Sequence, residues 1–101
     1  MIIHSVYFQL KPSATSRDIG RMRSALEGLS RIPGVQLLGV GTPADVPPRA
    51  VLCTDYTLAL VLSTDSVESL QTYQEHPIHR EFLQDFKDLW ETVRVFDLTT
   101  E

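Results

Sequence analysis

Several kinds of residue are scarce in this 101-residue sequence, and each scarcity argues against a class of protein. A single cysteine, Cys53, has no partner for a disulfide bond within the chain, which is usual in a reducing compartment. Nine basic residues stand against thirteen acidic ones, and no basic run occurs, so nucleic acid and anionic membranes are poor partners. No apolar stretch reaches the roughly 18 residues of a membrane span, and the opening MIIHSVYFQLKP lacks the basic start of a signal peptide. We therefore expect a cytoplasmic, soluble protein.

What is present is typical of an ordinary globular domain, with 43% hydrophobic and 22% charged residues. We expect one domain over residues 1–101. A chain of this length buries only about two thirds of its unfolded surface, so a partner subunit would add stability.

Hydrophobic periodicity predicts alternating strands and helices along the whole chain. Strands are expected over 2–10, 35–40, 54–63 and 93–98. A first helix follows Thr15, which can form a capping box with Asp18, and ends before Pro33. A second helical region starts with Thr64 or Asp65 as its cap and runs to about Trp90, with a break near Pro77. The order β-α-β-β-α-β predicts a ferredoxin-like α+β fold.

The two faces of the predicted sheet differ in what they carry. One face of the first strand is apolar except for His4, and it should pack under the helices. On the third strand, Tyr56 is assigned to the same side as the leucines at 58, 60 and 62. The other face carries Ile3, Tyr7 and Val61, which is too apolar for a free surface. This predicts a homodimer that pairs through the sheet faces.

The segment YQEHPIHREF, residues 73–82, holds two of the three histidines. Pro77 fits the first turn of a helix, which leaves His76 before it in a solvated or capping position. His79 then falls in the first turn, leaning toward the apolar side with Phe82 and Phe86, where the positive end of the helix favours a neutral imidazole. A neutral imidazole can act as a base, but a partly buried histidine bonded to a neighbour fits the same pattern.

Other polar residues also have two readings. His4 is either a satisfied core histidine or part of a wet site, because a buried polar group needs a partner. Tyr73 follows Leu70 at helical spacing, which fits core packing as well as catalysis. Asp97 in the last strand is expected to be structural or exposed. The spacing of His76 and His79 also fits a metal site, yet no third ligand in a usual zinc pattern stands nearby, so we expect no metal.

With MIIHSVYFQLKP, IPGV, VESLQTYQEHPIHREF and RVFDL in this order, the chain resembles the stress-responsive dimeric A/B barrel family over nearly its whole length. That resemblance implies a dimeric, ferredoxin-like α/β barrel. One member of the family is a plant cyclase that folds a linear polyketide into olivetolic acid without a cofactor. By resemblance, its catalytic tyrosine and histidine fall on Tyr73 and His79, and its first-strand histidine falls on His4.

The resemblance implies a cofactor-independent enzyme, of cyclase or lyase type, that transfers protons on a small carbonyl or phenolic metabolite. His79 would be the base, Tyr73 the donor to an oxyanion, and His4 a substrate-orienting partner. Two alternatives stay open from the same sequence. One is a non-catalytic dimer that binds a small apolar or phenolic ligand or persists under stress, and the other is a cofactor-free monooxygenase.

Overall fold

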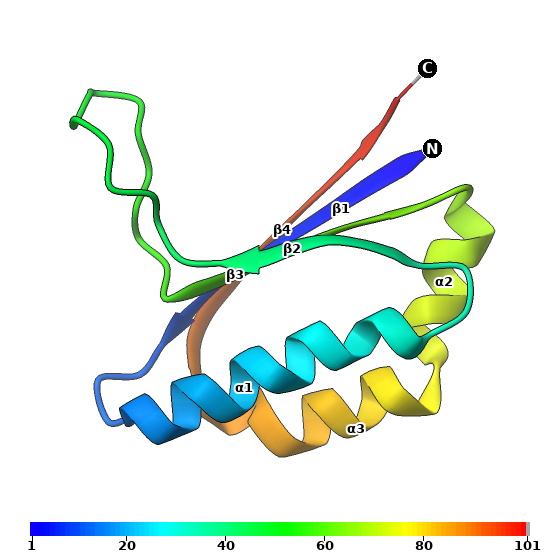
Figure 1. The fold of residues 1–101 in the computed structure, drawn as a ribbon, viewed down its shortest axis with the longest axis horizontal. Helices are drawn as coiled ribbons and strands as arrows, with labels where there is room; N and C mark the ends of the chain where they lie inside the picture. Colours follow the sequence, from blue (N-terminus) through cyan, green and yellow to red (C-terminus); the bar gives the residue numbers. More distant parts are fainter. Residues whose placement is uncertain (101) are drawn as a thin grey trace.

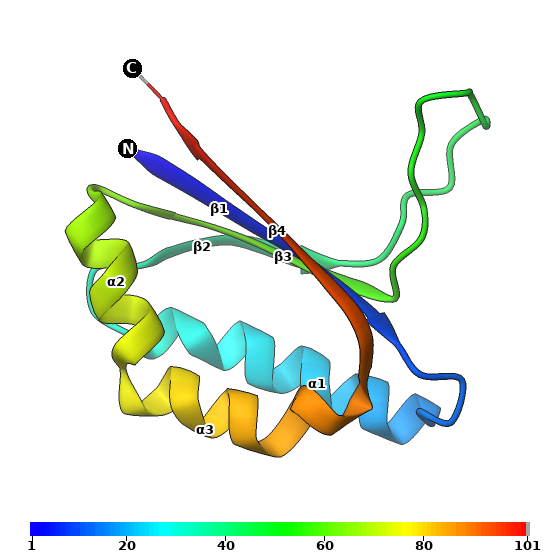
Figure 2. The ribbon, with the colours of Figure 1, turned by 180° about the vertical axis from the view of Figure 1, so that it is seen from behind.

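A computed structural model describes residues 1–100 of the chain, which form an antiparallel sheet with helices on one face (Figure 1). The strands lie in the order β2-β3-β1-β4. Helices α1 and α3 lie side by side under the sheet, and α2 lies at one end (Figures 1 and 2). The predicted ferredoxin-like α+β fold is confirmed. Its elements are β1 (Ile2–Leu10), α1 (Ser16–Gly28), a 3-10 turn (Leu29–Arg31), β2 (Gln36–Gly41), β3 (Leu58–Thr64), α2 (Val67–Glu75), α3 (Pro77–Phe86), a second 3-10 turn (Lys87–Leu89) and β4 (Trp90–Thr99).

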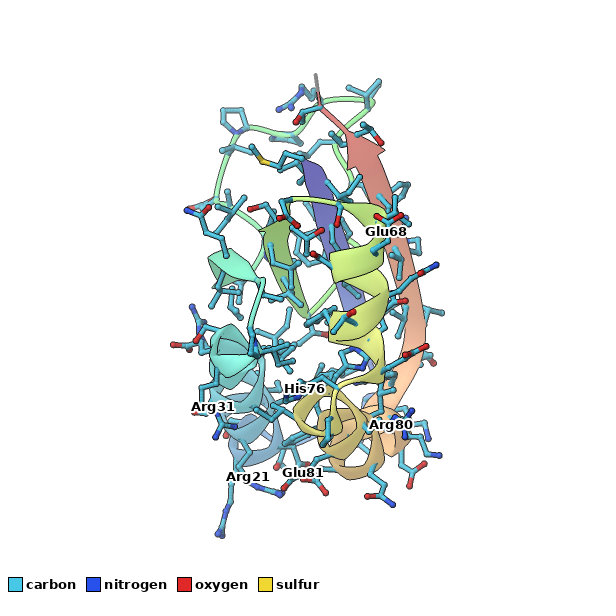
Figure 3. All side chains as sticks on the ribbon, turned by 90° about the vertical axis from the view of Figure 1, so that its right-hand side faces the viewer. Arg21, Arg31, Glu68, His76, Arg80 and Glu81 are labelled. Carbon is cyan, nitrogen blue, oxygen red and sulfur yellow. The ribbon has the colours of Figure 1, made fainter. Side chains whose placement is uncertain are left out.

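Side-chain caps fix where the helices start. Thr15 Oγ1 accepts a hydrogen bond from the Asp18 amide and the Asp18 carboxylate accepts one from the Thr15 amide, so the predicted capping box is confirmed. The predicted cap of α2 is wrong, because Ser66 Oγ accepts from the Ser69 amide while Thr64 remains the last residue of β3. At the break between α2 and α3, the His76 ring accepts from the Ile78 amide, which confirms its capping role (Figure 3).

The third strand is shorter than the sequence predicts. The predicted start at residue 54 is wrong, because β3 begins at Leu58 and residues 42–57 form a loop that leaves the sheet on the side away from the helices (Figure 2). Thr57 ends the ladder: its Oγ1 accepts from the Leu10 amide at 3.1 Å, in the position of a strand carbonyl. Tyr56 therefore does not face inward. Its ring packs edge-on against Tyr7 at 5.0 Å, on the outer face of the sheet.

The core lies between the inner face of the sheet and the helices. His4 is buried there at 3% exposure, among apolar side chains. The buried apolar residues are Ile2, Val6, Phe8, Leu10, Met22, Leu26, Leu29, Ile32, Leu58, Leu60, Leu62, Leu70, Tyr73, Phe82 and Phe86.

The outer face has no helix over it, as the sequence predicts. On β4 it exposes Phe96 and Leu98 by 57% and 54%. The two ends of the described chain meet beside this sheet, where the Thr100 amide donates to the Met1 carbonyl (Figure 1). Among residues 1–100, no helix has the length and apolar character that crossing a membrane requires.

Candidate functional site

A cavity of about 160 Å³ lies between the inner face of the sheet and the junction of α2 with α3. Three side chains with proton chemistry line it: His4 from β1, Tyr73 from α2 and His79 from α3. The rest of its wall is almost entirely apolar, and it comprises Val6, Phe8, Leu60, Gln74, Leu83, Trp90, Val93 and Val95.

The structure brings the three residues singled out from the sequence into one cluster. The Tyr73 ring stands edge-on to both imidazoles, with its centroid 5.8 Å from that of His4 and 4.8 Å from that of His79. They converge because His4 is on the inward side of β1 and Pro77 breaks the helical region. Tyr73 therefore lies near the end of α2, and His79 lies near the start of α3.

His4 is held by a carboxylate whose role the sequence did not indicate. In the antiparallel pairing of β1 with β4, His4 lies directly opposite Asp97, and its Nδ1 is 2.5 Å from Asp97 Oδ1. A carboxylate accepts, so Nδ1 carries a hydrogen and donates it to Asp97. The side chain of Asp97 is 41% exposed while that of His4 is 4% exposed, so the expectation of an exposed aspartate is confirmed. What the sequence missed is the register that pairs Asp97 with His4.

His79 is half-buried, and its environment favours the neutral ring. Burial lowers the pKa of its imidazole most, repulsion from His4 lowers it further, and the Gln74 backbone carbonyl opposes both. Nδ1 is buried and no group within residues 1–100 makes a hydrogen bond to it with normal geometry. The ring lines the cavity. Near pH 7 this ring is a neutral base.

Tyr73 is only 1% exposed, and burial raises the pKa of its phenol far above the usual value. Burial is the whole cause, with no contribution from a hydrogen bond or charge within residues 1–100. The phenol therefore stays protonated and its O–H is free to serve a bound molecule.

Trp90 lines the cavity and packs against the core. Its ring packs against Phe8 at 5.0 Å and Phe82 at 5.8 Å, and its Nε1 is buried without an acceptor among the described residues. His76 is occupied by its capping bond. Nowhere in residues 1–100 do three or more His, Cys, Asp or Glu side chains gather as a metal site would need.

A second hollow, of about 370 Å³, lies on the outer face of the sheet. Tyr7, Tyr56 and Phe96 form its apolar part, and Arg94 donates to the Cys53 sulfur at 3.1 Å. That bond to Arg94 lowers the pKa of the Cys53 thiol. This hollow shares no lining residue with the cavity of His4.

Comparisons with known proteins agree with this fold. The family model described as the Stress Responsive A/B Barrel Domain matches residues 2–100. No curated protein matches the chain.

Among solved structures, the chain is similar to At3g17210 from Arabidopsis thaliana, at 20% identity and a TM-score of 0.84, covering 100% of this chain and 96% of that one. It is similar to a dimeric ferredoxin-like protein of unknown function from Thermobifida fusca, at 21% identity and a TM-score of 0.80, covering 98% of this chain and 90% of that one. It is also similar to a hydroxynitrile lyase from Passiflora edulis, at 22% identity and a TM-score of 0.80, covering 99% of this chain and 93% of that one. At these identities the likeness shows the fold alone. The family model, which matches almost every residue, shows more: this chain belongs to the stress-responsive A/B barrel family.

Proposed function

We propose that this protein is a cofactor-independent enzyme that moves protons on a small carbonyl or phenolic compound held in the cavity of His4, Tyr73 and His79. One observation carries the proposal: these three proton-handling groups converge on one cavity whose wall is otherwise nearly all apolar. In such a site, water does not compete with the fixed donors and acceptors, so each is more effective than in solution.

The roles follow from the state of each group. His79 Nε2 takes a proton from the carbon beside a carbonyl, since its lowered pKa keeps the ring neutral. The Tyr73 phenol donates a hydrogen bond to the oxyanion that develops as the proton leaves. His4 is fixed by Asp97 and orients the substrate through Nε2. When the proton returns from His79 to carbon or to a leaving group, the enzyme is restored.

A lyase-type reaction uses the same groups. A base takes the proton from the hydroxyl of a cyanohydrin, the carbon–carbon bond to cyanide breaks and a carbonyl forms. The base then gives its proton to the departing cyanide, which leaves as hydrogen cyanide. The similarity to the Passiflora edulis hydroxynitrile lyase makes this a reaction to include in any screen.

We further propose that the working form is a homodimer joined through the outer faces of two sheets. Phe96 and Leu98 are more than half exposed there, beside Tyr7 and Val61. An apolar sheet face of this kind is normally covered. The dimeric Thermobifida fusca relative has the same fold.

Two probes test the enzyme. The first is exchange of the methyl protons of acetophenone for deuterium, followed by NMR, and the second is release of benzaldehyde from mandelonitrile, followed by absorbance. We expect one of them to be accelerated by the native protein, and both Tyr73→Phe and His79→Ala to remove the acceleration. Tyr56→Phe, a matched change on the outer face, should leave it unchanged. Turnover that survives in both cavity variants would contradict the proposed roles.

The alternatives give different results in the same samples. A non-catalytic binding dimer takes up ligand in the cavity but accelerates neither reaction. A cofactor-free monooxygenase consumes oxygen when given a quinol, which an oxygen electrode detects.

A further inference from the structure

We infer that the cavity takes uncharged compounds with a single ring and one hydroxyl or carbonyl oxygen, and that Leu83 sets its upper size limit. The inference rests on the proposed function in one respect, that this cavity is where the ligand binds. It adds the chemical class of the ligand and the residue that determines it.

The volume points to one ring. At about 160 Å³ the cavity is close in size to an engineered apolar cavity of about 150 Å³ in another protein, which binds benzene. A fused bicyclic compound would have to displace the packed wall, and forcing extra carbons into a packed site is costly.

The chemistry of the wall points to an uncharged ligand. No lysine or arginine lines the cavity, so a carboxylate or phosphate inside it would lose its water without gaining a cation. The carboxylate of Asp97 is bonded to His4, which lines the cavity, and a negative charge there repels an anion. The net charge of the chain, −4, also repels anions.

Tyr73 and the two histidines lie together, so we expect the oxygen of the ligand to be held beside them. Tyr73 stands within 6 Å, centroid to centroid, of both imidazoles, at 5.8 Å and 4.8 Å. A ligand oxygen held beside Tyr73 therefore lies close to both imidazole rings. The walls formed by Phe8, Leu60 and Leu83 offer no hydrogen-bonding partner, so the part of the ligand that lies against them is apolar.

Leu83 is the wall residue best placed to set the size. It lies four residues after His79 on α3, so the two side chains share one face of the helix. It is half-buried, and Leu83→Ala would remove three carbons from the wall. On the opposite wall, Val93 and Val95 of β4 are 37% and 49% exposed, which places the opening of the cavity beside that strand.

The test is a set of titrations of the full chain at pH 7, followed by calorimetry and by the NMR signals of the cavity residues. The probes are phenol, 4-methylphenol, 4-hydroxybenzoate and 2-naphthol. We expect the two neutral single-ring phenols to bind with similar affinity. 4-Hydroxybenzoate, which differs from 4-methylphenol by a charge at the same position, should bind at least about tenfold more weakly. 2-Naphthol should also bind at least about tenfold more weakly than phenol.

Leu83→Ala should bring the affinity for 2-naphthol to within about threefold of that for phenol, because the new space accommodates the second ring. Leu38→Ala, which shortens an exposed leucine on β2, should leave every affinity unchanged. If Leu83→Ala does not fold, Leu83→Val is the substitute and should shift the ratio of the two affinities in the same direction.

Equal binding of 4-hydroxybenzoate and 4-methylphenol would overturn the uncharged class. Equal binding of phenol and 2-naphthol by the native protein, or no effect of either Leu83 variant on their ratio, would overturn the size limit. Failure of every phenol to bind would overturn the inference as a whole. The proposed function is read separately, from deuterium exchange or benzaldehyde release, so binding without turnover refutes that function and leaves the inference standing.

Discussion

Replacing Tyr73 by phenylalanine separates a catalytic role from a structural one. The side chain is 1% exposed, and its ring packs against His4 and His79, so a structural reading predicts that changing it harms the fold. Phenylalanine keeps the ring and removes only the hydroxyl. Within residues 1–100 no hydrogen bond contributes to the state of that hydroxyl, so its removal breaks nothing inside the protein.

The expected magnitudes follow from that geometry. The Tyr73 side chain lines the cavity and its hydroxyl is not among the buried polar atoms without a partner, so Tyr73→Phe should change the free energy of unfolding by less than about 1 kcal/mol. Loss of one donor to an oxyanion costs about 10²- to 10³-fold in turnover. The variant should therefore be as stable as the native protein and far less active.

Urea unfolding gives the first quantity, from the shift in midpoint at constant slope, and the exchange or cleavage assay gives the second. Tyr56→Phe is the matched control, since it removes the same atom from a tyrosine on the outer face. A Tyr73→Phe variant that lost more than about 1 kcal/mol of stability while keeping full turnover would show that the hydroxyl has a structural partner and no catalytic role.

Three further predictions test the surroundings of the cavity. Asp97→Asn should lower turnover about 10- to 100-fold with the fold intact, because it replaces a charge-assisted hydrogen bond to His4 by a weaker one; unchanged kinetics would remove Asp97 from the site. Phe96→Glu should convert the proposed dimer into monomers in light scattering, since it places a charge on an exposed apolar sheet face; a dimer mass that this change leaves unaltered would contradict the proposed interface. The pKa of His79 is lowered in the folded state, so the unfolded state binds more protons below about pH 6.5, and the free energy of unfolding should fall as the pH drops through that region. In His79→Phe the free energy of unfolding should fall less steeply with pH. Parallel curves for the two proteins would contradict the lowered pKa.

The fold could be read from the sequence because its signals are local. The alternation in 2–10, the Thr15–Asp18 capping box and Pro77 each act within a few residues, and all three have the predicted effect. The cap of α2 was misplaced because Thr64, Asp65 and Ser66 are adjacent and equally able to cap. Which one does so depends on where β3 ends, and that is set by pairing with β1.

The site could be predicted only in part, for a related reason. His4, Tyr73 and His79 were recognisable as polar groups on apolar faces, and the resemblance pointed to the same three. Asp97 was not recognisable, because its contact with His4 depends on the register between the first and last strands, 93 residues apart. The prediction that Tyr56 faces the core was wrong because the pairing of the first and third strands stops at Thr57. There the side-chain Oγ1 of Thr57, instead of a backbone carbonyl, accepts the hydrogen bond from the Leu10 amide.

The most direct test of the account is an NMR titration of the His79 imidazole in the native protein and in His4→Asn, with and without phenol. We predict that the titration midpoint of His79 lies below the usual value of about 6.5 and rises when the neighbouring charge of His4 is removed. The His79 signals should also change when phenol binds. A midpoint near 6.5 that responds neither to His4→Asn nor to phenol would contradict the claim that these residues share one sheltered site for proton transfer.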